Sequence, residues 1–543
     1  MSPVAAPAGF RGTFRDDDFA RAMYSESAGI ARIIPVAVAI PVDHDDLALL
    51  VRWAAHEGVA LIPRGSASSM ANGAVGPGVV VDLRRFDTIG KVDVERGTLI
   101  VGAAVLRNAA DDAAARFRLS FPVDPSSGAF CTIGGMCATN AAGSRSVRVG
   151  AMRAWVHGVE CVFADGERVW LRRGETPPAL RTVRRVVDAL AGRLRIGDPA
   201  LSHVGVRKES SGYALAEYAR TGDLVDLLVG SEGTLAFITA VELRLTPALP
   251  ATASMLAAFP TLEDAAEAAG RLAVRDARAV ELLDRTFLDV CRATAEGRAL
   301  LEGVPDETEA VLLVEAADLY EVRASDQARA LGQAAAEAGA SAVRVASDNR
   351  DELAMWRLRH AASPILSQLD PHLASMQVIE DACVPPARFP TYIRGVRELA
   401  ERHGLRVVMF GHAGDAHAHV NLLVDTRRAG WRDQVAEMLD DVSAFVASLG
   451  GTLAGEHGDG RLRTPLLDLV WPEETRELFR LVKTAFDPVG ILNPGVKIPL
   501  RDALPFDAVK YDPTLPPLPA EARLALDAIA ADKGWARARL PEE

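Results

Sequence analysis

The segment at residues 121–150, FPVDPSSGAFCTIGGMCATNAAGSRSVRVG, constrains the fold more than any other part of the chain. Three of its glycines remove Cβ atoms where a backbone must turn tightly or approach a ligand closely: Gly134, Gly135 and Gly143. Short polar side chains stand beside them: Thr132, Thr139, Asn140 and Ser144. Such a segment suits a flat, phosphate-bearing ligand held by backbone amides. Because Gly, Ser and Asn are also frequent turn formers, the segment taken alone leaves a plain surface loop open.

Two more loops of the same kind occur elsewhere in the chain. Residues 63–73 read PRGSASSMANG, and residues 230–235 read GSEGTL. Three such loops favour a shared ligand site over three unrelated turns. No GxGxxG sequence opens a helix after the first predicted strand, so the ligand is not held by a Rossmann fingerprint.

In sequence order, the three loops resemble the PRGxGTS loop, the TIGGxxATNAxG segment and the GSEGTLG turn of the FAD-linked oxidases of the vanillyl-alcohol oxidase (PCMH) type. The resemblance implies non-covalent FAD, since no histidine occupies residues 64–73, where some relatives attach the flavin; His157 and His203 are the alternatives. Two departures stand out: Gly65-Ser66-Ala67-Ser68-Ser69 replaces GxGTS, and Val149 replaces a tyrosine. The implied FAD-binding residues are Arg64, Gly65, Ser66, Ala67, Ser68, Ser69, Asp124, Thr132, Ile133, Gly134, Gly135, Ala138, Thr139, Asn140, Glu232, Gly233, Ile238 and Asn493.

Size and composition set the broad class. A chain of 543 residues exceeds a single ordinary core, and 49% hydrophobic with 24% charged residues is typical of a globular protein. The net charge of −13 argues against a nucleic-acid partner. The longest apolar run, residues 33–42, contains Pro35 and Pro41, so we expect no membrane span and a cytoplasmic protein, peripheral to the membrane at most. Five scattered cysteines suggest neither a disulfide framework nor an iron-sulfur site.

The N-terminal half predicts two lobes. A helix at residues 45–57 ends at Gly58, and strands at 59–63 and 79–83 flank the first glycine loop, which predicts a small α/β lobe. Further strands are predicted at 99–105, 156–163, 168–171 and 237–245, with a hairpin turn at Asp165-Gly166. These strands predict a second, mostly antiparallel lobe.

A new rhythm of strand and alanine-rich helix begins after an Ala/Pro-rich connector at residues 247–253. Strands at 254–259, 310–315 and 342–346 alternate with helices at 262–274 and 322–336, which predicts an antiparallel sheet covered on one face by helices. Residues 486–495, FDPVGILNPG, resemble the FDPxGILNPGK signature that returns the chain to the flavin, and the tail from Asp507 onward is expected to be a surface arm. The predicted fold class is α+β, divided into an FAD-binding domain (1–248), a cap domain (249–472) and a C-terminal helical segment (473–543).

Three histidines occupy a predicted hairpin. Apolar strands at 407–410 and 420–424 flank GHAGDAHAH, and a two-residue turn at Asp415-Ala416 would place His412 opposite His419. Cross-strand partners lie about 5 Å apart, Cβ to Cβ, so both imidazoles could reach one ion. A solvated, histidine-rich turn is the alternative. The glycine-rich residues 450–460 add Glu456 and His457, which suit a third ligand and an adjacent base.

These two segments resemble the HxGDGNxHxN and GEHGxG signatures of the FAD-dependent D-2-hydroxyacid dehydrogenases, a group that includes D-lactate, glycolate and D-2-hydroxyglutarate enzymes. Where the signature has GDGN this chain has GDAH, which leaves His417 without an implied role. The resemblance also covers a W-x-x-R element at residues 356–359, in which Arg357 competes with Arg359. The roles that it implies are a divalent metal site, zinc first, at His412, His419 and Glu456; a catalytic base at His457; and substrate contacts at Arg359, Ser363 and Asn421.

The expected activity is oxidation of a D-2-hydroxy acid, D-lactate first, to the 2-oxo acid. The expected partners are the hydroxy acid, an electron acceptor (quinone, cytochrome or electron-transfer flavoprotein) and a second copy of the chain. Two other functions stay open: a flavin transferase resembling the alkyl-glycerone-phosphate synthases, and a non-catalytic subunit that only passes electrons. The GEHG loop and the two facing histidines argue against both.

Overall fold

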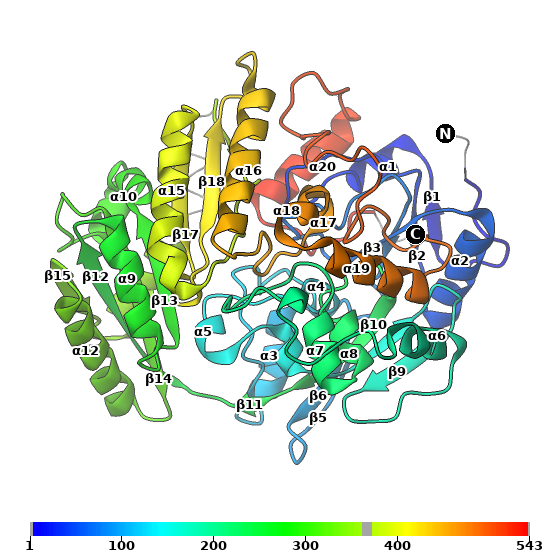
Figure 1. Cartoon of the computed structure of the whole chain (residues 1–543), viewed down its shortest axis with the longest axis horizontal. Coiled ribbons are helices and arrows are strands. Elements are labelled where there is room, and N and C mark those ends of the chain that lie inside the picture. Colours follow the sequence, from blue (N-terminus) through cyan, green and yellow to red (C-terminus); the bar gives the residue numbers. More distant parts are fainter. Residues whose placement is uncertain (1–3, 361–371, 541–543) are drawn as a thin grey trace.

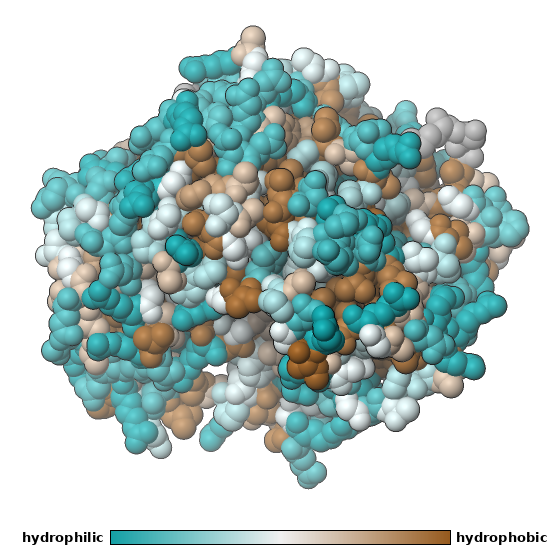
Figure 2. Space-filling view, in the orientation of Figure 1, coloured by the Kyte–Doolittle hydropathy of each residue, from teal (hydrophilic) through white to brown (hydrophobic). Residues whose placement is uncertain are grey.

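The computed structural model describes residues 4–360 and 372–540. Figure 1 shows the N-terminal half, in blue to cyan, beside a sheet with its helices, in green to yellow, while the orange and red C-terminal elements lie over the N-terminal half. On the face in Figure 2, hydrophilic side chains cover most of the surface, and the hydrophobic ones form separate patches. None of the helices in the described ranges combines the length and apolarity needed to cross a membrane.

The first lobe is built on a four-stranded sheet with the order β1-β2-β4-β3. Its strands are β1 (Thr13–Arg15), β2 (Ala37–Ile40), β3 (Leu61–Arg64) and β4 (Val79–Asp82), and its helices are α1 (Asp18–Met23) and α2 (His44–Glu57). Strands β3 and β2 both pair parallel to β4. Helix α2 begins at Asp43, whose side chain caps the Asp46 amide, and ends at Gly58, whose φ of 68° is left-handed. The predicted α/β lobe is confirmed.

The second lobe is a five-stranded antiparallel sheet, β5-β6-β10-β8-β9, as predicted. Its strands are β5 (Ile89–Asp93), β6 (Thr98–Gly102), β8 (Val156–Val162), β9 (Arg168–Arg172) and β10 (Phe237–Arg244). Its helices are α3 (Arg107–Ala115), α4 (Ile133–Thr139), α5 (Ser146–Val149), η1 (Met152–Trp155), α6 (Arg181–Leu190), η2 (Pro199–Leu201), α7 (Leu215–Thr221) and α8 (Leu224–Leu228). A two-stranded pair, β7 (Leu119–Ser120) with β11 (Thr246–Pro247), precedes the connector to the third sheet.

The third sheet has seven strands in the order β15-β12-β14-β13-β17-β18-β16, and every adjacent pair is antiparallel. The strands are β12 (Ala251–Phe259), β13 (Ala279–Asp284), β14 (Ala310–Asp318), β15 (Ala342–Val345), β16 (Ala374–Met376), β17 (Arg406–Gly411) and β18 (His419–Val424). Short 3-10 turns, η3 (Pro386–Arg388) and η4 (Ala413–Asp415), interrupt the connections.

Helices cover both faces of this sheet, which corrects the prediction of one covered face. On the first face lie α9 (Leu262–Ala273), α12 (Glu321–Glu337), α15 (Phe389–Arg402) and α16 (Trp431–Ser448). On the second lie α10 (Arg285–Arg292), α11 (Ala295–Leu300) and α13 (Asn349–His360). The strands are apolar on both sides: Met255 and Ala257 face the first layer, whereas Leu256 and Ala258 face the second. Successive strand residues alternate between faces, so two apolar faces require two layers.

The C-terminal segment packs onto the first two lobes. Its elements are α17 (Gly460–Arg463), η5 (Thr464–Leu466), α18 (Leu467–Val470), α19 (Glu473–Phe486) and α20 (Ala520–Ala531). Helix α19 lies against α6, and α20 lies against α1. The tail is therefore not a surface arm: Leu526 and Ile529 of α20 are buried in a cluster with Met23 and Val38. Apolar residues at 522, 526 and 529 share one helix face, which explains this packing.

Candidate functional site

One cavity of about 830 Å³ connects the three glycine loops with the histidine-rich hairpin. Its wall includes Arg64, Gly65, Ser66, Ala67, Ser68, Ser69, Thr132, Gly134, Gly135, Ala138, Thr139, Glu232, Gly233, Ile238, Arg359, His419, Asn421, Glu456 and His457. The C-terminal tail adds Lys510, Tyr511, Lys533 and Trp535 to the same wall. The cavity thus brings together most of the predicted cofactor-binding, substrate-binding and catalytic positions.

The glycine loops fit a large polar cofactor. A Cβ on Gly65 would lie 2.4 Å from Thr132 Oγ1, and one on Gly134 would lie 2.5 Å from the Cβ of Ala103. Only glycine therefore lets the first loop approach the second and the second approach the neighbouring sheet. Ser69 Oγ is buried in this wall without a hydrogen-bond partner among the described residues. A phosphate oxygen of FAD would satisfy it, so the residues present fit the cofactor.

Four of the predicted FAD residues brace the loops and do not line the cavity. Asn493 donates through Nδ2 to Gly73 O (3.1 Å) and Glu232 O (2.8 Å), which ties the first loop to the third. Asn140 donates to Glu209 O (3.1 Å), Ile133 is fully buried in the core, and Asp124 pairs with Arg145 (2.5 Å).

Arg64 lines the cavity, but its guanidinium points elsewhere. Its Nη1 donates to Tyr24 O and its Nη2 to Glu26 O, both at 2.9 Å. Burial lowers the pKa of Arg64 to about 9, and no carboxylate forms a hydrogen bond with its guanidinium in the described part of the chain. Arg64 therefore fixes the entry to the first loop, and the loop backbone faces the ligand.

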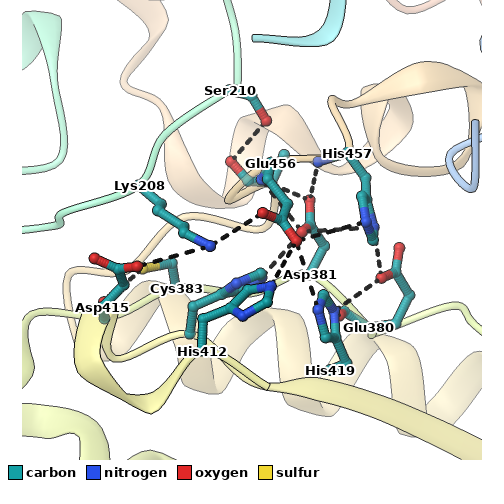
Figure 3. A network of polar contacts seen from close by, with 12 residues as sticks. Lys208, Ser210, Glu380, Asp381, Cys383, His412, Asp415, His419, Glu456 and His457 are labelled. Atoms are coloured by element: carbon teal, nitrogen blue, oxygen red, sulfur yellow. Dashed lines mark hydrogen bonds and ion pairs between the residues drawn. The ribbon is translucent and has the colours of Figure 1, made fainter. Parts of the chain in front are cut away.

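The predicted metal ligands lie together at the other end of the cavity. Glu456 Oε1 is 3.1 Å from His412 Nε2 and 3.5 Å from His419 Nε2 (Figure 3). Atoms held on one tetrahedral zinc ion lie about 3.4 Å apart, so this spacing fits a divalent metal. His412 is buried behind the wall, whereas His419 and Glu456 face the cavity.

The hairpin differs from the predicted one. Phe410, not His412, pairs with His419, because η4 lengthens the turn. The Asp415 side chain lies inside the protein, where its Oδ2 accepts a hydrogen bond from Ser146 Oγ at 2.5 Å. The His412 and His419 ring centroids are nevertheless 5.2 Å apart, and the two imidazoles lie edge to face across a longer turn.

Each ligand side chain is oriented by a second group. His412 Nδ1 lies 2.6 Å from Glu281 Oε1, and His419 Nδ1 lies 2.9 Å from Glu380 O. Because these acceptors hold Nδ1 of each ring as a hydrogen-bond donor, Nε2 of each ring faces Glu456 and would turn its lone pair toward a bound metal. Burial alone would raise the pKa of Glu456, but Lys208 and His412 outweigh it, so its pKa lies well below the usual range and the carboxyl is ionised.

His457 has an acidic neighbourhood that the sequence did not predict. Its Nδ1 lies 2.7 Å from Glu380 Oε2 and 3.6 Å from Asp381 Oδ1, and 27% of the side chain is exposed. Burial favours the neutral ring, but the two carboxylates outweigh it and raise the pKa of His457 to about 10. In the metal-free protein these carboxylates therefore favour the protonated ring, whereas the predicted role of His457 as a base requires a neutral one. A cation at Glu456 would oppose that shift.

The structure separates the two candidate arginines of α13. Arg359 is buried at the cavity wall, with its Nε 2.5 Å from Glu281 Oε2, whereas Arg357 is exposed. Asn421, on β18, also lines the cavity. Ser363, the remaining predicted substrate contact, lies outside the described residues.

Sequence reasoning missed four buried charged residues that organise the site: Lys208, Glu281, Glu380 and Asp381. Lys208 Nζ donates to Glu456 Oε2 (3.0 Å), and Glu281 binds both Arg359 and His412. For Glu380 and Asp381 a weak signal existed in the sequence, because these two adjacent acids follow the short strand β16. Lys208 and Glu281 lie too far along the chain from their partners for spacing to reveal them.

Comparisons with known proteins agree with this architecture. Residues 35–172 match the family described as FAD binding domain, and residues 249–496 match FAD linked oxidases, C-terminal domain. The chain is 32% identical over 460 residues to the D-lactate dehydrogenase of Archaeoglobus fulgidus, covering 84% of this chain and 89% of that protein. It is 28% identical over 495 residues to glycolate oxidase subunit GlcD of Bacillus subtilis, covering 90% and 94%.

Three further similarities were found, one to a sequence relative and two to solved structures. The D-2-hydroxyglutarate dehydrogenase of Escherichia coli is 28% identical over 535 residues, which span 93% of this chain and 52% of that protein. Among solved structures, the 4-ethylphenol oxidase of Gulosibacter chungangensis has a TM-score of 0.63 at 16% identity and covers 90% and 95% of the two chains. An alkyldihydroxyacetonephosphate synthase has a TM-score of 0.61 at 15% identity, covering 89% and 82%. At these identities the solved structures show a shared fold.

Proposed function

Because the chain belongs to the FAD-linked oxidase family, we propose that it is a dehydrogenase that oxidises a D-2-hydroxy acid, D-lactate first, to the 2-oxo acid. One observation carries the proposal: the cluster of His412, His419 and Glu456 borders the cavity that the glycine loops line, and His419, Glu456 and His457 form part of its wall. A flavoprotein that only passed electrons would not need a ligand cluster and a histidine base beside its flavin. We also propose zinc as the metal, since imidazole and carboxylate ligands suit it.

Different residues of the chain would bind different groups of the substrate. Arg359 would bind the substrate carboxylate, because a buried guanidinium offers a planar fork of donors, and Glu281 holds it in place. Asn421, at the same wall, would bind a second polar group. When bound, FAD supplies the acceptor for two electrons and the hydrogen of the substrate's C2, and the metal ion supplies a Lewis acid for the hydroxyl oxygen.

His457 would accept the hydroxyl proton at Nε2, since its Nδ1 is held by Glu380. Loss of that proton and of the C2 hydrogen with its electron pair converts the alcohol to the ketone. Lys208 keeps Oε2 of Glu456 occupied, so Oε1 is the oxygen that faces the two histidines.

The proposal is tested by anaerobic reduction of the bound flavin with paired D- and L-2-hydroxy acids. D-lactate or a related D-acid should bleach the flavin much faster than its enantiomer, because Arg359, the metal and the flavin fix three points around C2. Equal rates for both enantiomers would contradict the proposal.

A pair of variants on α13 tests the role of Arg359. Arg359→Lys should raise the KM for the D-acid by roughly tenfold or more, since an ammonium loses the bidentate contact. Arg357→Lys is the matched control, because Arg357 is exposed on the same helix, and it should leave KM unchanged. A similar KM for both variants would show that Arg359 does not bind the substrate carboxylate.

A further inference from the structure

His417 has no role in the proposed reaction, yet it lies among the metal ligands. Its side chain is fully buried, and its ring centroid lies 5.4 Å from that of His412 and 4.7 Å from that of His419. The resembling signature has an asparagine where this chain has His417, so the resemblance assigns this imidazole no role. Nothing in the three-ligand site described above uses it.

The hydrogen bonds of His417 leave one nitrogen without a partner. Its Nε2 lies 3.0 Å from Asp381 Oδ1, and the Asp381 carboxylate also accepts from the backbone amides of Glu456 and His457. An acceptor of this kind requires His417 Nε2 to carry the proton, so Nδ1 keeps its lone pair. Among the described residues no donor reaches Nδ1. A buried acceptor left unsatisfied is costly unless a ligand occupies it.

The other two histidines show the same arrangement. In His412 and His419, Nδ1 is held by an acceptor and Nε2 is directed at Glu456 Oε1. This is the pattern of metal-ligating histidines, in which the second nitrogen donates to a carboxylate or carbonyl. His417 repeats it with Asp381 as the orienting carboxylate.

The spacing also allows a fourth ligand. His412, His417, His419 and Glu456 each offer one ligand atom, and these atoms all lie within 4.8 Å of one another. Ligand atoms on one tetrahedral ion lie about 3.4 Å apart, so the most widely spaced atoms of this group would have to approach each other by up to about 1.4 Å when the ion binds.

We propose that His417 Nδ1 is a fourth protein ligand of the divalent metal, which gives a site of three histidines and one glutamate. This inference rests on the proposed function, because it concerns the same metal. It changes how the substrate binds: the hydroxyl oxygen would join an already four-coordinate ion as a fifth ligand, whereas a three-ligand site would offer it a vacant position.

The direct test is a crystal of the wild-type protein loaded with Zn²⁺, with the ion located by its anomalous scattering. A zinc ion at about 2.0–2.1 Å from His417 Nδ1, together with His412, His419 and Glu456, is the expected result. Zinc held by those three residues with His417 Nδ1 beyond about 3 Å would overturn this inference and leave the proposed function standing. No zinc at the cluster would overturn both.

Metal affinity gives a second, independent readout. His417→Asn should weaken Zn²⁺ binding by about 100-fold or more in competition with a chromophoric chelator, since even outer partners of metal ligands are worth 10–100-fold. His203→Asn is the matched control, because the His203 side chain is also buried and bonded to the carboxylate of Glu209, but it belongs to no ligand cluster among the residues that the structure describes. An unchanged zinc affinity in His417→Asn would overturn the inference.

Discussion

The Glu456 carboxylate is contacted by Lys208, His412 and His419, and each contact restricts the position of one of its oxygens. Lys208 holds Oε2 at 3.0 Å, while His412 and His419 face Oε1. Lys208 is buried: burial favours its neutral amine, but the Glu456 and Asp415 carboxylates outweigh burial and raise the pKa of Lys208. The ammonium therefore stays charged and balances one of the buried carboxylates.

His457, next to Glu456, is the residue whose removal should slow flavin reduction without affecting FAD or metal binding. His457→Ala should leave FAD and metal bound and slow flavin reduction by roughly 10²-fold or more, which is the usual contribution of a positioned base. Stopped-flow reduction by D-lactate, with flavin absorbance and elemental analysis as controls, measures this. A full reduction rate in a variant that holds both cofactors would show that another group takes the proton.

At the scale of elements, the C-terminal helix α20 tests whether the tail belongs to the core. Leu526 is 2% exposed against α1 and β2, and Leu524 on the same helix is 72% exposed. Leu526→Ala should lower the free energy of unfolding by about 2–5 kcal/mol, the range for buried leucines, and Leu524→Ala should change it by less than about 0.5 kcal/mol. Urea unfolding of the two variants measures the difference. Equal changes in the free energy of unfolding would show that α20 is not packed into the core.

Glu160 joins three elements and should make stability depend on pH. It accepts hydrogen bonds from His44 of α2 (2.8 Å) and from Arg168 of β9 (2.7 Å). Burial opposes its charge, but these hydrogen bonds outweigh burial and lower the pKa of Glu160 to about 2.

A carboxylate with a lowered pKa stabilises the fold above its unfolded pKa, and that stability is lost as pH falls toward the folded value. Between about pH 5 and pH 3, the wild type should therefore lose more unfolding free energy than Glu160→Gln, which cannot titrate. Thermal unfolding at several pH values compares them. Parallel losses in the two proteins would show that Glu160 does not contribute.

Local patterns in the sequence predicted individual helices and strands better than the segments that those elements pack against. The two lobes, the hairpin strands and the ligand triplet follow from glycine loops, alternation and motif spacing. The hairpin register was wrong, because η4 and the buried Asp415–Ser146 contact depend on a residue 269 positions away. The apolar face of α20 was readable at residues 522, 526 and 529, but nothing local indicates that α1 covers it.

At the scale of the whole molecule, the site forms only where the lobes that carry the glycine loops meet the seven-stranded sheet. Arg145 of the glycine-rich segment binds Glu315 of β14 at 2.9 Å, and Ser146 binds Asp415 in the turn between His412 and His419. The flavin segment is thereby fixed against the sheet that carries His412 and His419. No single part of the described structure holds both the cofactor loops and the ligand cluster.

In the proposed reaction, the flavin, the metal and the base act on one substrate in this shared cavity. It is tested most directly by anaerobic flavin reduction with D-lactate in three samples: metal-loaded protein, chelated protein, and a His419→Ala variant whose metal content is known from elemental analysis. Fast reduction is expected only in the loaded protein, and the chelated protein should recover when the metal is restored. Reduction at the original rate in protein shown to hold no metal would contradict the proposed reaction and would favour a flavin-only electron carrier.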